Sequence, residues 1–330
     1  MDEGVTRLFR RASVGPRRAV RRYFGYRVVY AWQLPAIMRK HIYTGAMGNI
    51  YSRLLSGVFF VYFGNRVGLT PFDWGLMGGL TSFLIVAQVF SALLTEVSGR
   101  RKLVWFATAF SERALRLAGI LAAFWLWSSG RGGAAFALIA SVCAANLLGA
   151  MASPPWLSWL ADIIPAKSHG QFWGRRAAWV SLSVIVVMTP IGFLMDQADD
   201  TGKMTIALWT FVAGGLTGLL DIVIHGTIPE PRVRSIGGGD AFRRLFAPLR
   251  DRGFRPWLVF NFCWTASMSL GGSLSLVFLI EDLKIKQNML AGAMCVTGCS
   301  LLGGMVTSRW SGRMVDRLGV RRMLRWGHLG

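Results

Sequence analysis

Three charged residues lie close together in the middle of a hydrophobic segment. Glu112, Arg113 and Arg116 fall within residues 103–127, which are otherwise mostly apolar. A charge deep in the hydrocarbon interior of a membrane costs at least about 2.5–3.5 kcal/mol, so each of these groups needs a partner. Glu112 and Arg116 are four residues apart and can neutralise each other on one helix face. Arg113 points elsewhere, which leaves two interpretations open: an ion pair with an acid on another helix, or a water-filled cavity.

The elements that must position these residues are helices that cross a membrane. The chain has 330 residues, of which 53% are hydrophobic and only 16% charged. The apolar residues form eight blocks of the length that a membrane-spanning helix requires. We therefore predict an all-α, polytopic membrane protein. The predicted spans are residues 46–64, 74–94, 103–127, 134–160, 177–195, 204–224, 257–280 and 289–306.

The chain has a net charge of +21, and the distribution of its basic residues indicates how it is oriented in the membrane. With the N-terminus in the cytoplasm, the inner segments hold 29 lysine and arginine residues and the outer loops hold 5. This asymmetry follows the positive-inside rule and predicts a cytoplasmic N-terminus. A nucleic-acid-binding protein would instead gather its basic residues on one face of a soluble fold, so nucleic acid is not an expected partner.

Two loops about 220 residues apart repeat one pattern. Residues 92–102 read ALLTEVSGRRK, and residues 312–322 read GRMVDRLGVRR. Each places a small residue, an acid four positions later, a glycine three positions after that, and then basic residues. The two acids, Glu96 and Asp316, are 220 residues apart and are predicted on the same side of the membrane.

This repeat resembles the signature loop of the major facilitator superfamily, Gly-x-x-x-Asp-Arg/Lys-x-Gly-Arg-Arg, which follows helices two and eight. The second copy matches closely, whereas the first has alanine at the first glycine position, glutamate for aspartate and valine for the basic residue. Residues 161–176 also look like the family's loop between helices four and five. The matching positions are Glu96, Gly99, Arg100 and Arg101 in the first copy, and Gly312, Asp316, Arg317, Gly319 and Arg321 in the second.

The resemblance implies twelve helices in two six-helix lobes, of which this chain carries about eight. We therefore expect a basic cytoplasmic segment (1–45), a six-helix lobe (46–224), a cytoplasmic linker (225–256) and a partial second lobe (257–330). The chain is identified as a C-terminally truncated member, and as such it is expected not to transport by itself.

In the repeated loops, the two acids are expected to hold helices in one arrangement between the lobes. A carboxylate at a helix end can pair with arginines and accept backbone hydrogen bonds. For Arg101, Lys102 and Arg322 we favour a role in topology alone.

In this family helices one, four and seven usually line a central cavity. The resemblance therefore implies that Asn49, Arg53, Asn146, Asn261 and Trp264 are cavity residues. Further intramembrane polar candidates are Gln88 and Asp221, and Asp221 lies close enough to the inner helix end to favour a structural pair. Since Arg53 and Arg113 lack acidic partners on their own helices, we also hypothesise an anionic or zwitterionic solute.

The function that these features predict is secondary active transport of a small solute by alternating access. The expected partners are that solute, a coupling ion and the lipid bilayer, with no cofactor and no metal, and the expected location is a bacterial inner membrane. The chain's few histidines and cysteines form no catalytic constellation, so we do not expect an enzyme. A lipid-modifying membrane enzyme and a non-transporting sensor on a transporter scaffold remain the alternatives.

Overall fold

The structure is a computed structural model that describes residues 23–232, 247–264 and 298–319, with a few single positions besides. In this part of the chain every regular element is a helix, and the sole β-pairing is an isolated bridge between Tyr26 and Glu230. The predicted all-α class is confirmed. The helices used below are α3 (Leu34–Leu54), α4 (Val58–Arg66), α5 (Pro71–Leu84), α6 (Ala87–Ser98), α7 (Arg101–Ser128), α8 (Ala134–Ile163), α9 (His169–Gln197), α10 (Asp200–His225), α12 (Ala247–Arg250) and α15 (Cys299–Leu318).

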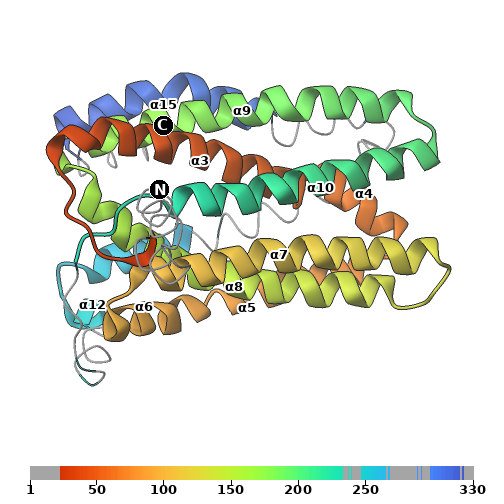
Figure 1. Cartoon of the computed structure of the whole chain (residues 1–330), viewed down its shortest axis with the longest axis horizontal. Coiled ribbons are helices and arrows are strands. Elements are labelled where there is room, and N and C mark those ends of the chain that lie inside the picture. Colours follow the sequence, from red (N-terminus) through yellow and green to blue (C-terminus); the bar gives the residue numbers. More distant parts are fainter. Residues whose placement is uncertain are drawn as a thin grey trace, which may run out of the picture.

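The long helices lie side by side along one axis (Figure 1). Helices α9 and α15 run along one side of the bundle, α5 to α8 form the other side, and α3 and α10 lie between them. The connections α7–α8 and α9–α10 lie at one end, and the connections α6–α7 and α8–α9 lie at the opposite end. The basic loops that were predicted to face the cytoplasm therefore gather at a single end of the molecule.

Four helical stretches are long and apolar enough to cross a membrane: Pro71–Ser98, Ala134–Ile163, His169–Gln197 and Asp200–His225. They coincide with the second, fourth, fifth and sixth predicted spans. The third predicted span is α7, which carries the charged residues of the site. Most of the seventh predicted span and the first part of the eighth lie outside the described residues, as does Arg321, whereas the end of the eighth span belongs to α15. Large apolar side chains such as Phe72, Phe136 and Trp209 are mostly exposed on the outer surface, as in a protein surrounded by lipid.

The first predicted span begins too late. Helix α3 starts at Leu34, twelve residues before the predicted start at Ala46, and it buries Ile37, His41 and Ile42. The basic residues in this region had indicated a cytoplasmic segment that ends at residue 45. Arg39 and Lys40 lie on an otherwise packed helix, because only one face of α3 must be apolar. The chain then turns at residues 55–57 and continues as α4.

Glycines allow α10 to lie directly against α3. A Cβ atom on Gly218 would lie 2.6 Å from the ring of Tyr51, and one on Gly214 would lie 2.7 Å from Leu55. Small residues four positions apart let two helix backbones approach closely, and this pair does so. The equivalent pair, Gly75 and Gly79 on α5, meets nothing within 4 Å among the described residues, so spacing alone did not identify a packed face.

The second signature motif is mostly helical. Helix α15 continues to Leu318, so Gly312, Asp316 and Arg317 belong to its last turns and not to a loop. The helix ends at Gly319, whose φ of +82° suits glycine. The predicted loop boundary is thus wrong, because the apolar pattern stops about three turns before the backbone hydrogen bonds do.

Candidate functional site

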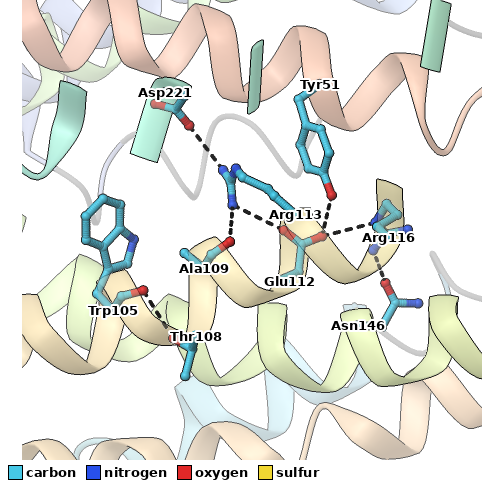
Figure 2. Close-up of polar contacts among 9 residues, drawn as sticks. All are labelled: Tyr51, Trp105, Thr108, Ala109, Glu112, Arg113, Arg116, Asn146 and Asp221. Carbon is cyan, nitrogen blue, oxygen red and sulfur yellow. Dashed lines mark hydrogen bonds and ion pairs between the residues drawn. The ribbon is translucent and has the colours of Figure 1, made fainter. Parts of the chain in front are cut away.

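Glu112 is the centre of a buried polar network on α7 (Figure 2). Its carboxylate accepts a hydrogen bond from the Tyr51 hydroxyl of α3 at 2.7 Å. It also pairs with Arg116 Nε at 3.1 Å and with Arg113 Nη1 at 3.2 Å. The pair with Arg116 is the i, i+4 contact that the sequence predicted. Because three donors converge on one carboxylate, Glu112 joins α3 to α7.

Arg113 pairs with acids on two helices, Glu112 of its own helix and Asp221 of α10, so the expectation that its own helix offers it no acidic partner is wrong. Its Nη2 lies 3.1 Å from Oδ2 of Asp221 on α10, so the guanidinium bridges Asp221 and Glu112 (Figure 2). Gly48 of α3 faces this pair, and a Cβ there would lie 2.7 Å from Asp221 Oδ2. The Arg113 charge is therefore matched by acids, and the hypothesis of an anionic solute receives no support from this residue.

The network continues to α8 and α5. Arg116 Nη2 donates to Oδ1 of Asn146 at 2.5 Å, and the Asn146 amide donates to Thr81 at 2.8 Å. Asn146, which the family resemblance places in the cavity, thus orients a buried arginine. Five helices meet in one set of hydrogen bonds, which gives this half of the bundle a fixed internal arrangement.

A cavity of about 390 Å³ lies beside the network, between α3, α7, α8, α9 and α10. Its lining includes Glu112, Arg113 and Asp221 of the network, together with Asn49 and Arg176. The full set of lining residues is Thr44, Gly45, Gly48, Asn49, Tyr51, Ser52, Trp105, Ala109, Glu112, Arg113, Gly149, Ala152, Ser153, Trp156, Arg176, Asp221, Ile222 and His225. The wall is mixed aromatic and polar, as small-molecule sites are.

His225 lines this cavity in a defined protonation state. The indole Nε1 of Trp156 lies 3.1 Å from its Nε2, and the hydroxyl of Thr44 lies 2.7 Å from its Nδ1. An indole N–H can only donate, so Nε2 must be the unprotonated nitrogen. The Thr44 hydroxyl itself donates to the Lys40 carbonyl, which leaves its oxygen to accept from Nδ1–H. His225 is therefore neutral as long as the Trp156 contact persists.

The acid of the second motif binds the end of a neighbouring helix. Asp316 on α15 accepts hydrogen bonds from the backbone N–H groups of Gly170 and Gln171, both at 2.8 Å. These groups form the first turn of α9, where the helix dipole favours a negative charge. Gly312 allows the close approach, since a Cβ there would lie 2.3 Å from the Gly170 carbonyl oxygen. We call these interactions the α9–α15 contact.

The first motif copy is arranged differently. Gly99 ends α6 with a φ of +65°, and Glu96 and Arg100 are exposed. Glu96 makes no ion pair with any residue that the structure describes. Arg101 is buried and pairs with Asp162 at 2.6 Å, and it also donates to the Ser158 carbonyl.

Lys102 is also buried, at the start of α7 and before the predicted span. Its Nζ donates to the carbonyls of Tyr23 and Ile228, and the Glu230 carboxylate accepts from its backbone N–H. Burial lowers the pKa of Lys102 to about 8 and raises the pKa of Glu230. A role in topology alone, as predicted for Arg101 and Lys102, is wrong, because both side chains tie separate segments of the chain together.

The remaining predicted site residues lie away from the network. Arg53 is exposed on α3, and Gln88 is partly exposed on α6. Asn261 and Trp264 lie on the helical residues 255–264, are exposed, and do not line the cavity. Arg317 is exposed on α15. The resemblance implied cavity positions for Arg53, Asn261 and Trp264, but these side chains are exposed and are not among the residues that line the cavity.

Sequence reasoning missed Tyr51, Trp156 and His225 as members of the site, and it read Arg176 only as part of a loop motif. Aromatic residues in apolar helices are common and give no local signal. Arg176 directly follows another arginine, and the pair looked like an inner-loop charge.

A comparison with known families matches residues 42–330 to the Major Facilitator Superfamily. The chain belongs to this family. The predicted resemblance is confirmed, and the chain is an integral membrane protein of a transporter family. No curated protein and no solved structure gives a significant match.

Proposed function

We propose that this major facilitator superfamily chain moves a small solute across the membrane as a secondary transporter with alternating access, although its resemblance to a truncated member had led us to expect no transport by the chain alone. In this proposal the bundle of α3 to α10 acts as one lobe and α15 belongs to the other. The buried network of Glu112 keeps the first lobe rigid, and the adjacent cavity supplies its half of the solute site. Alternating access then requires a contact between the lobes that can form and break.

The observation that supports this proposal best is the α9–α15 contact. It joins the carboxylate of Asp316 to two backbone N–H groups at a helix end. Such a contact can break without unfolding either helix, because water can replace the carboxylate at an exposed helix terminus. Hydrogen bonds to a charged group contribute about 1.5–3 kcal/mol, which is enough to bias two conformations by about 10- to 150-fold.

We further propose that this end of the molecule faces the cytoplasm of a bacterial cell, since the basic loops gather there. The α9–α15 contact would then close the cytoplasmic side. The solute would enter or leave on that side only after Asp316 separates from α9.

The test measures how easily the cavity is reached from the cytoplasmic side. The native cysteines are replaced by serine, Ser153 on the cavity wall is replaced by cysteine, and labelling by a membrane-impermeant thiol reagent is followed in inside-out vesicles. Asp316→Asn should raise the labelling rate about 10- to 100-fold, because the helix end loses its charged acceptor. Arg313→Gln, an exposed change on the same helix, should leave the rate unchanged.

Equal labelling rates in the Asp316→Asn variant and the parent would contradict the proposed closure. Solute flux in proteoliposomes separates the transporter from the two alternative functions, because neither an enzyme nor a sensor moves solute down an imposed gradient.

A further inference from the structure

Together, the cavity wall and the Glu112 network behind it hold three guanidinium groups and two carboxylates. Arg113 and Arg116 match the carboxylates of Glu112 and Asp221. Arg176 of α9 is the third guanidinium group here, and among the described residues it forms no ion pair within 4.0 Å. Asp221 attracts it electrostatically but forms its contact with Arg113. One basic group thus faces the cavity without a carboxylate of its own.

Arg176 is nevertheless held in a fixed position. Its guanidinium carbon lies 5.4 Å from the ring centroid of Trp156 and 5.4 Å from that of Trp173. On its other side is Gly45 of α3, where a Cβ atom would lie 2.5 Å from Nε and 2.7 Å from Nη2. Aromatic faces attract a guanidinium but accept no conventional hydrogen bond from it. The two tryptophan rings therefore provide no acceptor for the N–H donors of Arg176.

The Nε atom of Arg176 is buried and has no hydrogen-bond partner among the described residues. A buried donor without an acceptor is unfavourable, and native proteins rarely retain one without a reason. Arginine is the side chain best suited to bind a carboxylate, because two parallel N–H groups fit its two oxygens. An unmatched, oriented guanidinium beside a cavity is therefore a ready binding group for an anion.

We propose that Arg176 is the counter-charge for a small organic monocarboxylate, whose carboxylate group binds the guanidinium inside the cavity. This inference rests on the proposed function, since it names the class of solute for the same cavity. A single unmatched charge favours a monoanion over a dianion. The indole of Trp105 offers an apolar face to the body of the solute, and Asn49 and Ser153 offer polar groups. A volume of about 390 Å³ suits a compact molecule.

The decisive measurement compares ligands that differ mainly in charge. The full chain is purified in detergent, and the fluorescence of its tryptophans, two of which contact Arg176, is titrated at constant ionic strength. The probes are benzoate, benzamide and benzylamine, together with acetate and lactate as smaller monocarboxylates. At least one monocarboxylate should bind saturably, and benzamide and benzylamine should bind at least about tenfold more weakly than benzoate if benzoate is that ligand. No saturable binding by any of the three monocarboxylates, or equal binding of benzoate and its neutral amide, would overturn the proposal.

Two single variants test whether Arg176 is the group that binds the carboxylate. Arg176→Gln should weaken binding of the monocarboxylate about 10- to 100-fold, the range expected when a charged hydrogen-bond partner is lost. Arg175→Gln is the matched control, because its side chain is exposed one position earlier on the same helix, and it should bind normally. Equal weakening by both changes would point to surface charge and would overturn the assignment to Arg176.

A second variant keeps the test valid if Arg176→Gln does not fold. Gly45→Ala places a methyl group against the guanidinium and should weaken binding by displacing it. Gly75→Ala, whose methyl group meets nothing within 4 Å among the described residues, should leave binding unchanged. Unchanged binding in Gly45→Ala would count against the inference.

Failure of the inference can be told apart from failure of the proposed function. Monocarboxylate binding without flux in proteoliposomes would support the site and contradict transport. Flux of a neutral or cationic solute with no monocarboxylate binding would support transport and contradict the monocarboxylate site.

Discussion

Replacing Glu112 by glutamine should destabilise the bundle strongly. The Glu112 carboxylate accepts a hydrogen bond from Tyr51 and pairs with both Arg113 and Arg116. Glu112 is only 6% exposed. A glutamine side chain has the same size, but it loses the charge and turns an amide N–H₂ group toward a guanidinium donor. Removing one partner of a buried ion pair costs about 3–5 kcal/mol, because the other charge stays buried. We expect the free energy of unfolding to fall by that amount.

The assay is reversible unfolding by sodium dodecyl sulfate in mixed micelles, followed by tryptophan fluorescence. Glu96→Gln serves as the control, because Glu96 is exposed and its loss should change the free energy by at most about 0.5 kcal/mol. The double variant Glu112→Gln with Arg116→Met removes one of the stranded charges. It should therefore be more stable than the sum of the two single changes predicts, by about 1–3 kcal/mol.

Two results would refute this reasoning. A loss of less than about 1 kcal/mol in Glu112→Gln would mean that the carboxylate is solvated or not needed as a charge. Strictly additive effects in the double variant would mean that Glu112 and Arg116 do not interact in the native protein.

Three further predictions concern other parts of the chain. Gly218→Ala should lower the free energy of unfolding by about 1–3 kcal/mol, because a Cβ there would lie 2.6 Å from an aromatic ring of α3, whereas Gly79→Ala should be tolerated. Burial lowers the pKa of Lys102 to about 8 in the native state, whereas the ordinary lysine value of 10.5 applies when the chain is unfolded. The unfolded state therefore binds more protons between these two pH values, and stability should rise with pH across that window. Lys102→Met should abolish this rise in the same unfolding assay. Single cysteines at Gly238 and Asp199 should label from opposite sides of the membrane, and labelling from one side would refute the predicted topology.

Contacts within one helix could be predicted from the sequence. The pair Glu112–Arg116 follows from the helical repeat, because residues four apart always lie on the same face. The long apolar spans follow from the thickness of the bilayer, and four of them match helices of the structure. The closely matching second motif indicated the family, which the comparison then confirmed.

The first helix shows where such patterns fail. The apolar run predicted its start at Ala46, yet α3 begins at Leu34, because a helix packed on one side tolerates charges on the other. The same applies to Arg101 and Lys102, which a charge count assigns to a loop surface and the structure buries. Charge patterns report which side of the membrane a segment occupies, and they do not report how deeply its side chains pack.

Contacts between helices were decided only by the tertiary structure. Arg113 needed an acid from elsewhere, and the sequence offered several without ranking them. In the structure this acid is Asp221, 108 positions away, because α10 packs against α7 with the Asp221 face toward Arg113. Likewise, Asp316 meets backbone N–H groups at the start of α9, a partner that no side-chain pattern could reveal. The helical repeat fixes which residues share a face, but the rotation and spacing of neighbouring helices, set by glycines and bulky side chains along the whole bundle, determine which faces meet.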